Sequence, residues 1–293
     1  MPVRSETKGT VGGEMTPKEQ WDREGYVFVK QIYEPERVAR LLAICNQTLE
    51  QWRICNPENG KPGGDENTNC MRHLNHPGYF RDNPVHRPVL LDAIADPSVI
   101  GLTRELFGEE PLFRCTSFFF NPSASSQDGN WHRDSQFGTP DDAAEKAVLQ
   151  DRGVNGSSVQ MQIALEASDD VEVVPGSHLR WDTPEEYAIR KADEQRNSRS
   201  NEMPGAIRPL LEPGDAILFN PAGLHRGRYH AGRVRRTFML TFTKTSSPYY
   251  DYFSHQPWCL ESGYLEGVKQ ETRAFFDAFI DIYTEAWKKA LSQ

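Results

Sequence analysis

The chain has 293 residues and a formal net charge of -9 at pH 7. Its 37% hydrophobic and 11% aromatic residues suffice for a sizeable core, which excludes a wholly disordered chain. Nucleic acids and anionic membrane surfaces attract basic proteins, so the acidic balance points instead to a small-molecule partner.

The cysteines and the N-terminus bear on where the protein works. The chain has 5 cysteines, widely spaced and without a CxxC pair: Cys45, Cys55, Cys70, Cys115 and Cys259. They predict neither a disulfide framework nor a zinc ribbon, and they fit a reducing compartment. The N-terminus has no apolar signal segment, and no later run is long enough to span a bilayer. We expect a cytoplasmic protein without membrane contact, and its oligomeric state is left open.

The chain begins with an aperiodic stretch rich in Gly, Thr and Glu. This composition predicts a disordered tail over residues 1–15, ahead of one domain over residues 16–293. Folding is expected to start at Thr16, because Thr16, Pro17 and Glu19 form the N-capping pattern of a short helix.

The next part of the chain mixes helices, a strand and a long loop. Residues 25–30 are rich in β-formers, and apolar residues at helical spacing predict a helix from Pro35. Residues 56–84 carry Pro, Gly and Asn throughout, which predicts an irregular excursion that acts as a lid or is mobile. Another helix is expected over residues 96–107. Together these segments make a helical and loop-rich N-terminal part over residues 16–110.

The second half of the chain is predicted to be mainly β. Six strand-like segments separated by turn residues cover residues 112–121, 158–165, 171–174, 206–211, 216–220 and 237–243. Apolar residues at helical spacing then predict a C-terminal amphipathic helix at about residues 263–291, packed onto the β unit. The fold class is therefore mainly β with flanking helices.

One predicted strand has two faces of different character. Val159, Met161 and Ile163 alternate with Gln160 and Gln162. On a plain sheet the Gln face meets solvent, whereas in a barrel covered by helices it lines a wet cavity. Periodicity leaves both interpretations open, so the two glutamines are candidate cavity residues only.

A candidate metal centre follows from three side chains. His132 and Asp134 are two residues apart, which places both on one face of an extended segment. A lone His-x-Asp pair is more often surface polarity, but His225 supplies a third ligand after a turn, a buried strand and a second turn. Two His and one carboxylate leave open positions for a cosubstrate and O₂, the arrangement of non-haem Fe(II) oxygenases. We therefore expect His132, Asp134 and His225 to bind iron and form the catalytic centre.

A keto-acid cosubstrate such as 2-oxoglutarate calls for a further cation. It chelates iron through one end, and its other carboxylate must be paired when it is buried. Arg233, Arg235 and Arg236 follow His225 closely, and a guanidinium binds a carboxylate bidentately. Alternation groups Arg235 with Thr237, Met239 and Thr241, and Arg236 with the aromatic face that we expect to pack on an outer helix. We select Arg235, with Arg236 as the alternative if the strand register slips by one.

Four features in this order carry a resemblance to a known family: WHRD at 131–134, IAL at 163–165 with VVPGSH at 173–178, PGD at 213–215 with LHRG at 224–227, and RRT at 235–237. In order and spacing, residues 16–245 resemble the phytanoyl-CoA dioxygenase family of Fe(II)/2-oxoglutarate oxygenases. The resemblance implies a double-stranded β-helix (jelly roll), with its core over residues 111–245. It also implies Fe(II), O₂ and a 2-oxoglutarate held by an arginine shortly after the second histidine.

The chain departs from the family pattern at two places. Many relatives have Gln where this chain has Arg133, which is expected to point away from the ligand face. The run 169–171 replaces an Asn-Gly turn, which puts cosubstrate contacts beyond the arginine in doubt. Family halogenases lose the carboxylate ligand, whereas Asp134 is retained here, which favours hydroxylation or another oxygen-derived oxidation.

Other polar residues have simpler interpretations. We expect His178 to be a turn residue that fixes nearby backbone or borders the site, and His73, His76 and His86 to be solvent-facing or lid residues. The basic cluster over residues 226–236 is expected to neutralise nearby carboxylates, with binding of an anionic substrate as the alternative.

The predicted function is oxidation of a small, polar or carboxylated metabolite, with succinate and CO₂ as by-products. Two alternatives are a non-catalytic jelly-roll ligand-binding protein and a cupin-type metalloenzyme that does not use 2-oxoglutarate. The intact trio with its arginine argues against the first, and the lack of a further His/Glu ligand set on the strands argues against the second. The substrate's identity does not follow from the sequence, because many substrates share this fold and metal site.

Overall fold

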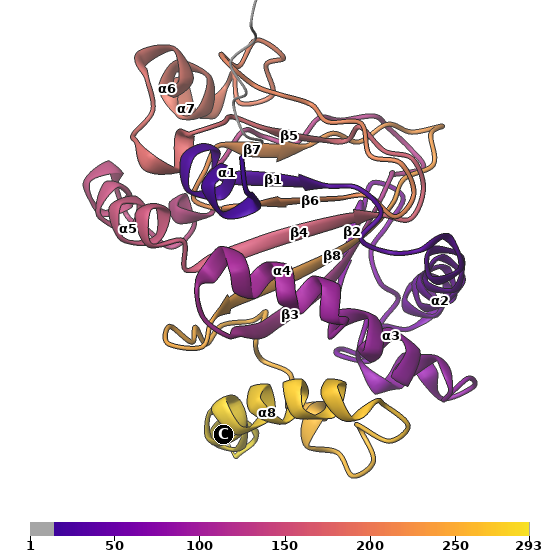
Figure 1. The fold of residues 1–293 in the computed structure, drawn as a ribbon. Coiled ribbons are helices and arrows are strands. Elements are labelled where there is room, and N and C mark those ends of the chain that lie inside the picture. The colour runs from indigo at the N-terminus through magenta and orange to yellow at the C-terminus, as the bar shows by residue number, and fades with distance from the viewer. Residues whose placement is uncertain (1–14, 293) are drawn as a thin grey trace, which may run out of the picture.

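A computed structural model describes residues 15–292, so nearly all of the predicted tail lies outside the described residues. The main sheet is antiparallel, in the order β1 (Tyr26–Val29), β6 (Ala216–Phe219), β4 (Ser158–Ala164), β8 (Arg236–Lys244), β3 (Pro111–Phe120) and β2 (Cys70–Arg72). A second sheet pairs β5 (Val171–Val173) with β7 (His225–Gly227). Figure 1 shows this small sheet beside β1 and β6, with α-helices covering the outer face of the large one.

The N-terminal helices begin where their capping residues predict. α1 (Pro17–Glu24) starts with a capping box between Thr16 and Glu19 and ends at Gly25, whose φ is 74°. α2 is Pro35–Ile54, and α4 (Pro97–Phe107) starts at Asp96, whose side chain accepts a hydrogen bond from the Ser98 amide. Local capping chemistry therefore fixes where two of these helices begin.

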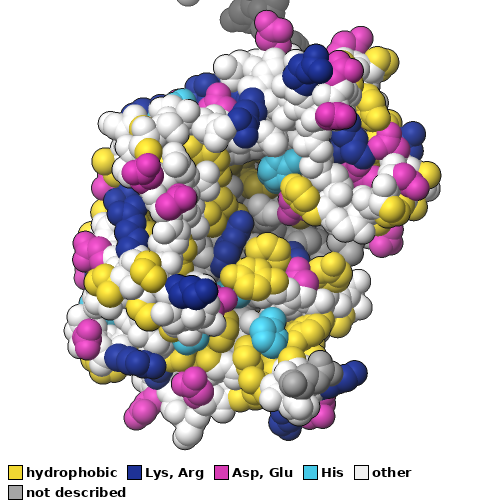
Figure 2. Space-filling model, turned by 180° about the vertical axis from the view of Figure 1, so that it is seen from behind, with side chains coloured by type: hydrophobic (Ala, Val, Ile, Leu, Met, Phe, Trp, Pro, Cys, Tyr) yellow, Lys and Arg dark blue, Asp and Glu magenta, His cyan; other side chains and the backbone are white. Residues whose placement is uncertain are grey.

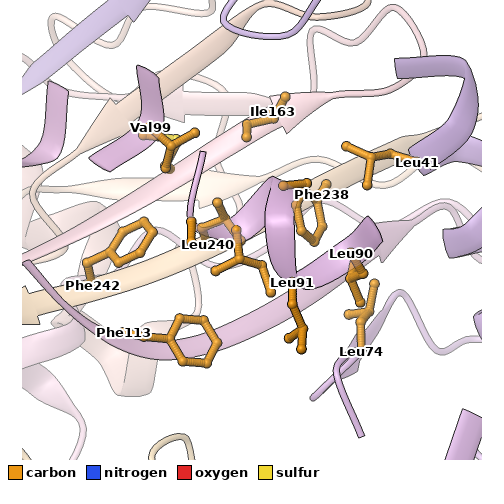
Figure 3. Close-up of a cluster of buried hydrophobic side chains, with 14 of the residues drawn as sticks. Leu41, Leu74, Leu90, Leu91, Val99, Phe113, Ile163, Phe238, Leu240 and Phe242 are labelled. Carbon is orange, nitrogen blue, oxygen red and sulfur yellow. The ribbon is translucent and has the colours of Figure 1, made fainter. Parts of the chain in front are cut away.

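The outer face of the large sheet packs against helices. Figure 3 shows Phe238, Leu240 and Phe242 of β8 in one buried cluster with Phe113 of β3 and leucines of α2 and α3. The aromatic face of β8 is thus the packed face, as predicted. The other face of the strand, which carries Thr237, Met239 and Thr241, is left for the interior of the barrel.

The C-terminal helix is shorter than predicted. α8 (Gln270–Leu291) packs on β3, with the Phe276 and Phe279 rings 5.2 and 5.0 Å from the Phe113 ring. The expected start near residue 263 is wrong because Gly263 and Gly267 adopt positive φ angles of 79° and 81°, which hold this stretch in turns.

Several further elements were not predicted. These are α3 (His86–Ile94), α5 (Asp142–Asn155), α6 (Pro184–Arg190), α7 (Ala192–Gln195), β7 and short 3₁₀ turns at Pro77–Phe80, Asp134–Gln136, Ser177–Leu179 and Pro257–Leu260. The expected strand over residues 206–211 is wrong, since only isolated bridges form there, at Ile207 and Leu211. Residues 56–84 are not wholly irregular, because β2 lies within them.

Two sequence expectations concern the whole chain. All the cysteines are free, as expected for a chain without a disulfide framework. Among the helices of residues 15–292, none has both the length and the apolar character needed to cross a membrane.

Candidate active site

The structure brings His132, Asp134 and His225 together. A β-bridge joins the two histidine backbones, with N···O distances of 3.1 and 3.0 Å. Asp134 begins a 3₁₀ turn two residues later, and its Oδ1 atom lies 3.7 Å from His132 Nε2 and 3.6 Å from His225 Nε2. One potential ligand atom from each side chain lies within 4.8 Å of the others. A single ion between them would therefore reach all three.

Backbone carbonyls set the tautomer of both histidines. Nδ1 of His132 lies 2.7 Å from the Asn130 carbonyl oxygen, and Nδ1 of His225 lies 2.9 Å from that of Gly223. A carbonyl only accepts, so each Nδ1 carries a proton and each Nε2 keeps its lone pair. Burial, reinforced by His132, lowers the pKa of His225 to about 4. The His225 ring is therefore neutral near pH 7, as a metal ligand must be.

Gln160 holds the carboxylate of the trio. Its Nε2 donates a 2.6 Å hydrogen bond to Asp134 Oδ2, which leaves Oδ1 as the oxygen that faces both imidazoles. Such outer contacts fix the orientation of a ligating carboxylate. Gln160 is therefore hydrogen-bonded directly to a candidate metal ligand.

A cavity of about 610 Å³ opens beside the trio. Its wall includes Gln160 and Gln162 of β4 and Met239 and Thr241 of β8, as well as the three candidate ligands. The glutamine face of β4 therefore lines an interior cavity, which resolves the two interpretations left open by the alternation. Figure 2 shows a hollow in the surface with a histidine side chain in its wall and basic and hydrophobic side chains around it.

Arg235 and Arg236 point to opposite sides of β8. Arg235 is 1% exposed and lines the cavity, and it donates to the Arg228 carbonyl (3.0 Å) and to Gln162 Oε1 (3.3 Å). Arg236 instead donates a 2.6 Å bond to Asn46 of α2. Since the register follows the predicted alternation, Arg235 is the one of these two arginines whose guanidinium faces the cavity.

Three of the remaining sequence expectations agree with the structure. Arg133 points away from the cavity and pairs with the buried Asp182. The basic cluster meets carboxylates, as in the pairs Arg228–Asp128 and Arg233–Asp169. His178 fixes nearby backbone, because its buried ring fills the space beside Gly25, where an added Cβ would lie 2.3 Å from Nδ1.

The expectation for His73 is wrong. His73 is fully buried, and its ring nitrogens lie 2.9 Å from Glu58 Oε1 and 3.1 Å from the Phe253 carbonyl oxygen. It is buried because β2 draws the excursion onto the large sheet and against the C-terminal segment. His76 is half-buried, and His86 begins α3.

Sequence reasoning missed part of the cavity wall. Arg72, Arg114, Tyr249, Asp251 and Phe253 line the cavity. They come from two strands and from a segment after the core, and no local motif marks them. Pairing of β2 with β3 is what brings Arg72 to Ser117.

Comparison with known proteins places the chain in a family. A family model described as phytanoyl-CoA dioxygenase (PhyH) matches residues 21–238, whereas no curated protein matches the sequence. EctD from S. alaskensis with bound Fe has a TM-score of 0.56 at 17% identity, covering 88% of this chain and 86% of that chain. AviO1 from Streptomyces viridochromogenes Tue57 has a TM-score of 0.55 at 16% identity, covering 80% and 96%.

A third solved structure is the non-heme alpha ketoglutarate dependent epimerase SnoN from nogalamycin biosynthesis. Its TM-score is 0.52 at 17% identity, covering 77% of this chain and 79% of that chain. At such low identity these likenesses show the fold, the jelly roll that the family resemblance implied. The family model matches more than half of the chain, so this protein belongs to the phytanoyl-CoA dioxygenase family.

Proposed function

We propose that the protein is an Fe(II)/2-oxoglutarate-dependent dioxygenase that hydroxylates or otherwise oxidises a polar or carboxylated small molecule. Family membership supports an oxygenase of this class or a related enzyme. The observation that carries the proposal is the convergence of two imidazole Nε2 atoms and one carboxylate oxygen on one cavity wall. This donor set suits Fe(II) and leaves coordination positions open.

Each side chain then has a defined task. His132, Asp134 and His225 would hold Fe(II), which supplies the O₂-activating chemistry when it is bound. Gln160 keeps Asp134 turned toward the metal position. Arg235 would bind the distal carboxylate of 2-oxoglutarate, because it is a buried guanidinium held between the Phe119 and Tyr229 rings, 5.2 and 5.0 Å away.

A small-molecule substrate agrees with the cavity. Its volume of about 610 Å³ is within the range of small-molecule sites, roughly 300–1,000 Å³. Two related structures contain small molecules: one is EctD from S. alaskensis with 2-oxoglutarate and 5-hydroxyectoine, and the other is SnoN with Fe3+, alpha ketoglutarate and nogalamycin RO. From these two structures we infer for this protein only that its substrate is a small molecule.

The test is succinate formation by anaerobically loaded protein after O₂ is admitted. Wild type with Fe(II) and 2-oxoglutarate is expected to form succinate slowly even without the prime substrate, and His132→Ala is expected to form none. Arg235→Met should raise the half-saturating concentration of 2-oxoglutarate roughly 10- to 100-fold, because charged hydrogen bonds contribute about 1.5–3 kcal/mol. Arg236→Met is the matched control, since it removes a neighbouring guanidinium outside the cavity.

The proposal fails if wild type binds Fe(II), yet 2-oxoglutarate produces neither a charge-transfer band without O₂ nor succinate with O₂. That pair of results would favour a ligand-binding protein. Equal effects of Arg235→Met and Arg236→Met would remove the cosubstrate role of Arg235.

A further inference from the structure

Guanidinium groups and aromatic rings alternate along one wall of the cavity. The order is Arg235, Phe119, Arg72, Phe253 and Arg114, and successive guanidinium-to-ring distances are 5.2, 5.4, 5.3 and 5.0 Å. We call this row the arginine ladder. Stacking on rings holds a guanidinium in place without neutralising its charge, so the ladder presents fixed positive charge to the cavity.

The three cations of the ladder differ in how their charges are balanced. Arg114 pairs with Asp251 at 2.5 Å, and Arg235 has Asp170 at 3.8 Å. Arg72 donates a 2.6 Å hydrogen bond to the neutral Ser117 hydroxyl and contacts the two rings. Across residues 15–292, none of the ion pairs includes Arg72. The middle of the ladder is therefore a cavity-facing cation that no described carboxylate contacts directly, and Asp134, a candidate metal ligand, attracts it from a longer distance.

The register of the strands places this cation between two ends of the cavity. Phe119 is opposite Thr237 at the Arg235 end, and Cys115 is opposite Thr241 next to Arg114. Gln160, which holds Asp134, is also opposite Thr241. The proposed cosubstrate end and the Arg114 end thus lie on either side of Arg72 along the wall.

The aromatic wall beside Arg72 is fixed in position. The carbonyl oxygen of Phe253 lies 3.1 Å from His73 Nε2 and accepts a 2.9 Å bond from Gln256, and its amide donates to Asp251 at 3.1 Å. Phe253, Asp251 and Gln256 follow position 238, where the family match ends. The chain therefore builds this part of the cavity from a segment outside the matched region.

We propose that the prime substrate carries an anionic group, a carboxylate or a phosphate, that Arg72 binds, with Phe253 and Arg114 forming the adjoining wall. This inference rests on the proposed function. With 2-oxoglutarate bound to the metal at one end and to Arg235 at the other, both of its carboxylates have partners, so the charge of Arg72 is left for a second ligand. Arg72 is then the residue that selects for substrate charge.

The test uses three probes of similar size: phenylacetate, phenyl phosphate and the neutral 2-phenylethanol. Each is titrated anaerobically into the Fe(II)–2-oxoglutarate protein, and binding is followed by calorimetry and by the change in the charge-transfer band. We expect at least one anion to bind 10-fold or more tightly than the alcohol. The better-bound anion tells whether the site suits a carboxylate or a phosphate.

Variants separate charge recognition from structure. Arg72→Met is expected to weaken anion binding roughly 10- to 100-fold, the effect of losing a charged hydrogen bond, with the 2-oxoglutarate half-saturation unchanged. Arg72→Lys, which keeps the charge, should recover most of the binding. Asp251→Asn keeps the turn but removes a negative charge, so it should tighten anion binding, and Arg236→Met should have no effect.

Two results would overturn the inference. One is equal binding of the alcohol and both anions. The other is that Arg72→Met raises the 2-oxoglutarate half-saturation as Arg235→Met does, which would make Arg72 a cosubstrate residue. Because wild-type succinate formation is measured separately, either result with succinate still formed refutes this inference and leaves the proposed function standing.

Discussion

Two groups of arginines lie near the candidate metal ligands, one buried in the protein and one in the cavity wall, and a single cation of the second group lacks the ion pair that the others have. Behind the trio, Arg133 and Arg190 are 0% exposed and share Asp182, at 2.8 and 2.7 Å. In the cavity, Arg72 has no ion-pair partner among the described residues. A buried charge destabilises the fold unless an opposite charge pairs with it. An unpaired charge that faces a cavity is instead available to a ligand.

The paired group is placed to hold the ligand loops together. Arg133 lies between His132 and Asp134 in the chain, and its Nη1 atom donates 2.7 Å hydrogen bonds to the carbonyls of Ser177 and Ala222. Ala222 is part of the turn that leads to His225. One buried guanidinium therefore joins the two segments that carry the three candidate ligands, and we regard it as scaffold.

The largest expected effect comes from removing the shared countercharge of the scaffold. Asp182→Asn leaves two buried guanidinium groups with reduced pairing, so the free energy of unfolding should fall by about 3–5 kcal/mol. Arg72→Met, the matched change in the cavity, should lower it by no more than about 1.5 kcal/mol, because it breaks no ion pair and only the hydrogen bond to Ser117. Denaturant unfolding of both variants tests the contrast, and similar losses would remove the distinction between the two groups.

A smaller effect should separate two neighbouring glutamines on the cavity side. Gln160→Leu frees Asp134 to rotate, so metal affinity should fall about 10- to 100-fold, as outer-shell substitutions usually cause. Gln162→Leu, two residues along the same strand, removes a partner of Arg235 instead. It should weaken 2-oxoglutarate binding and leave metal affinity unchanged. Titration of each variant with Fe(II) and then with 2-oxoglutarate checks both outcomes, and a loss of metal affinity in Gln162→Leu would contradict this division.

The residues that sequence analysis located are those whose placement depends on local rules. Alternation along β8 was enough to separate Arg235 from Arg236, and capping residues located the starts of α1 and α4. A hydrogen-bonded bridge between distant segments brings His132 to His225, as expected for two ligands of one metal ion.

The parts that were missed depend on long-range packing. Arg72 meets Phe253 only because the excursion and the C-terminal segment close over the same sheet, and nothing near either residue records this contact. The same closure buries His73, which the loop-like composition of residues 56–84 predicted to be a solvent-facing or lid residue. α5 was missed because its sequence is polar and has no strong apolar stripe. Its capping residue Asp141 alone was too weak an indication of a helix.

The smallest expected effect is a pH-dependent loss of stability that comes from His178, which lies behind the trio. His178 is buried next to Gly25, and its Nδ1 atom has no hydrogen-bond partner within the described part of the chain. Burial lowers the pKa of His178 to about 4. In the unfolded chain its pKa is about 6.5, so between these values the unfolded state binds a proton that the folded state does not.

Stability contributed by His178 is therefore complete above pH 6.5 and is lost as pH falls toward 4. Between pH 7 and pH 5 the free energy of unfolding should drop by about 1–2 kcal/mol more in wild type than in His178→Gln, which cannot take up the proton. Denaturant unfolding of both proteins at the two pH values measures this difference directly. Arginines keep their charge over this range, so a matching pH dependence in the two proteins would assign the acid sensitivity to groups other than the ring packed on Gly25, such as His225, whose pKa burial also lowers to about 4.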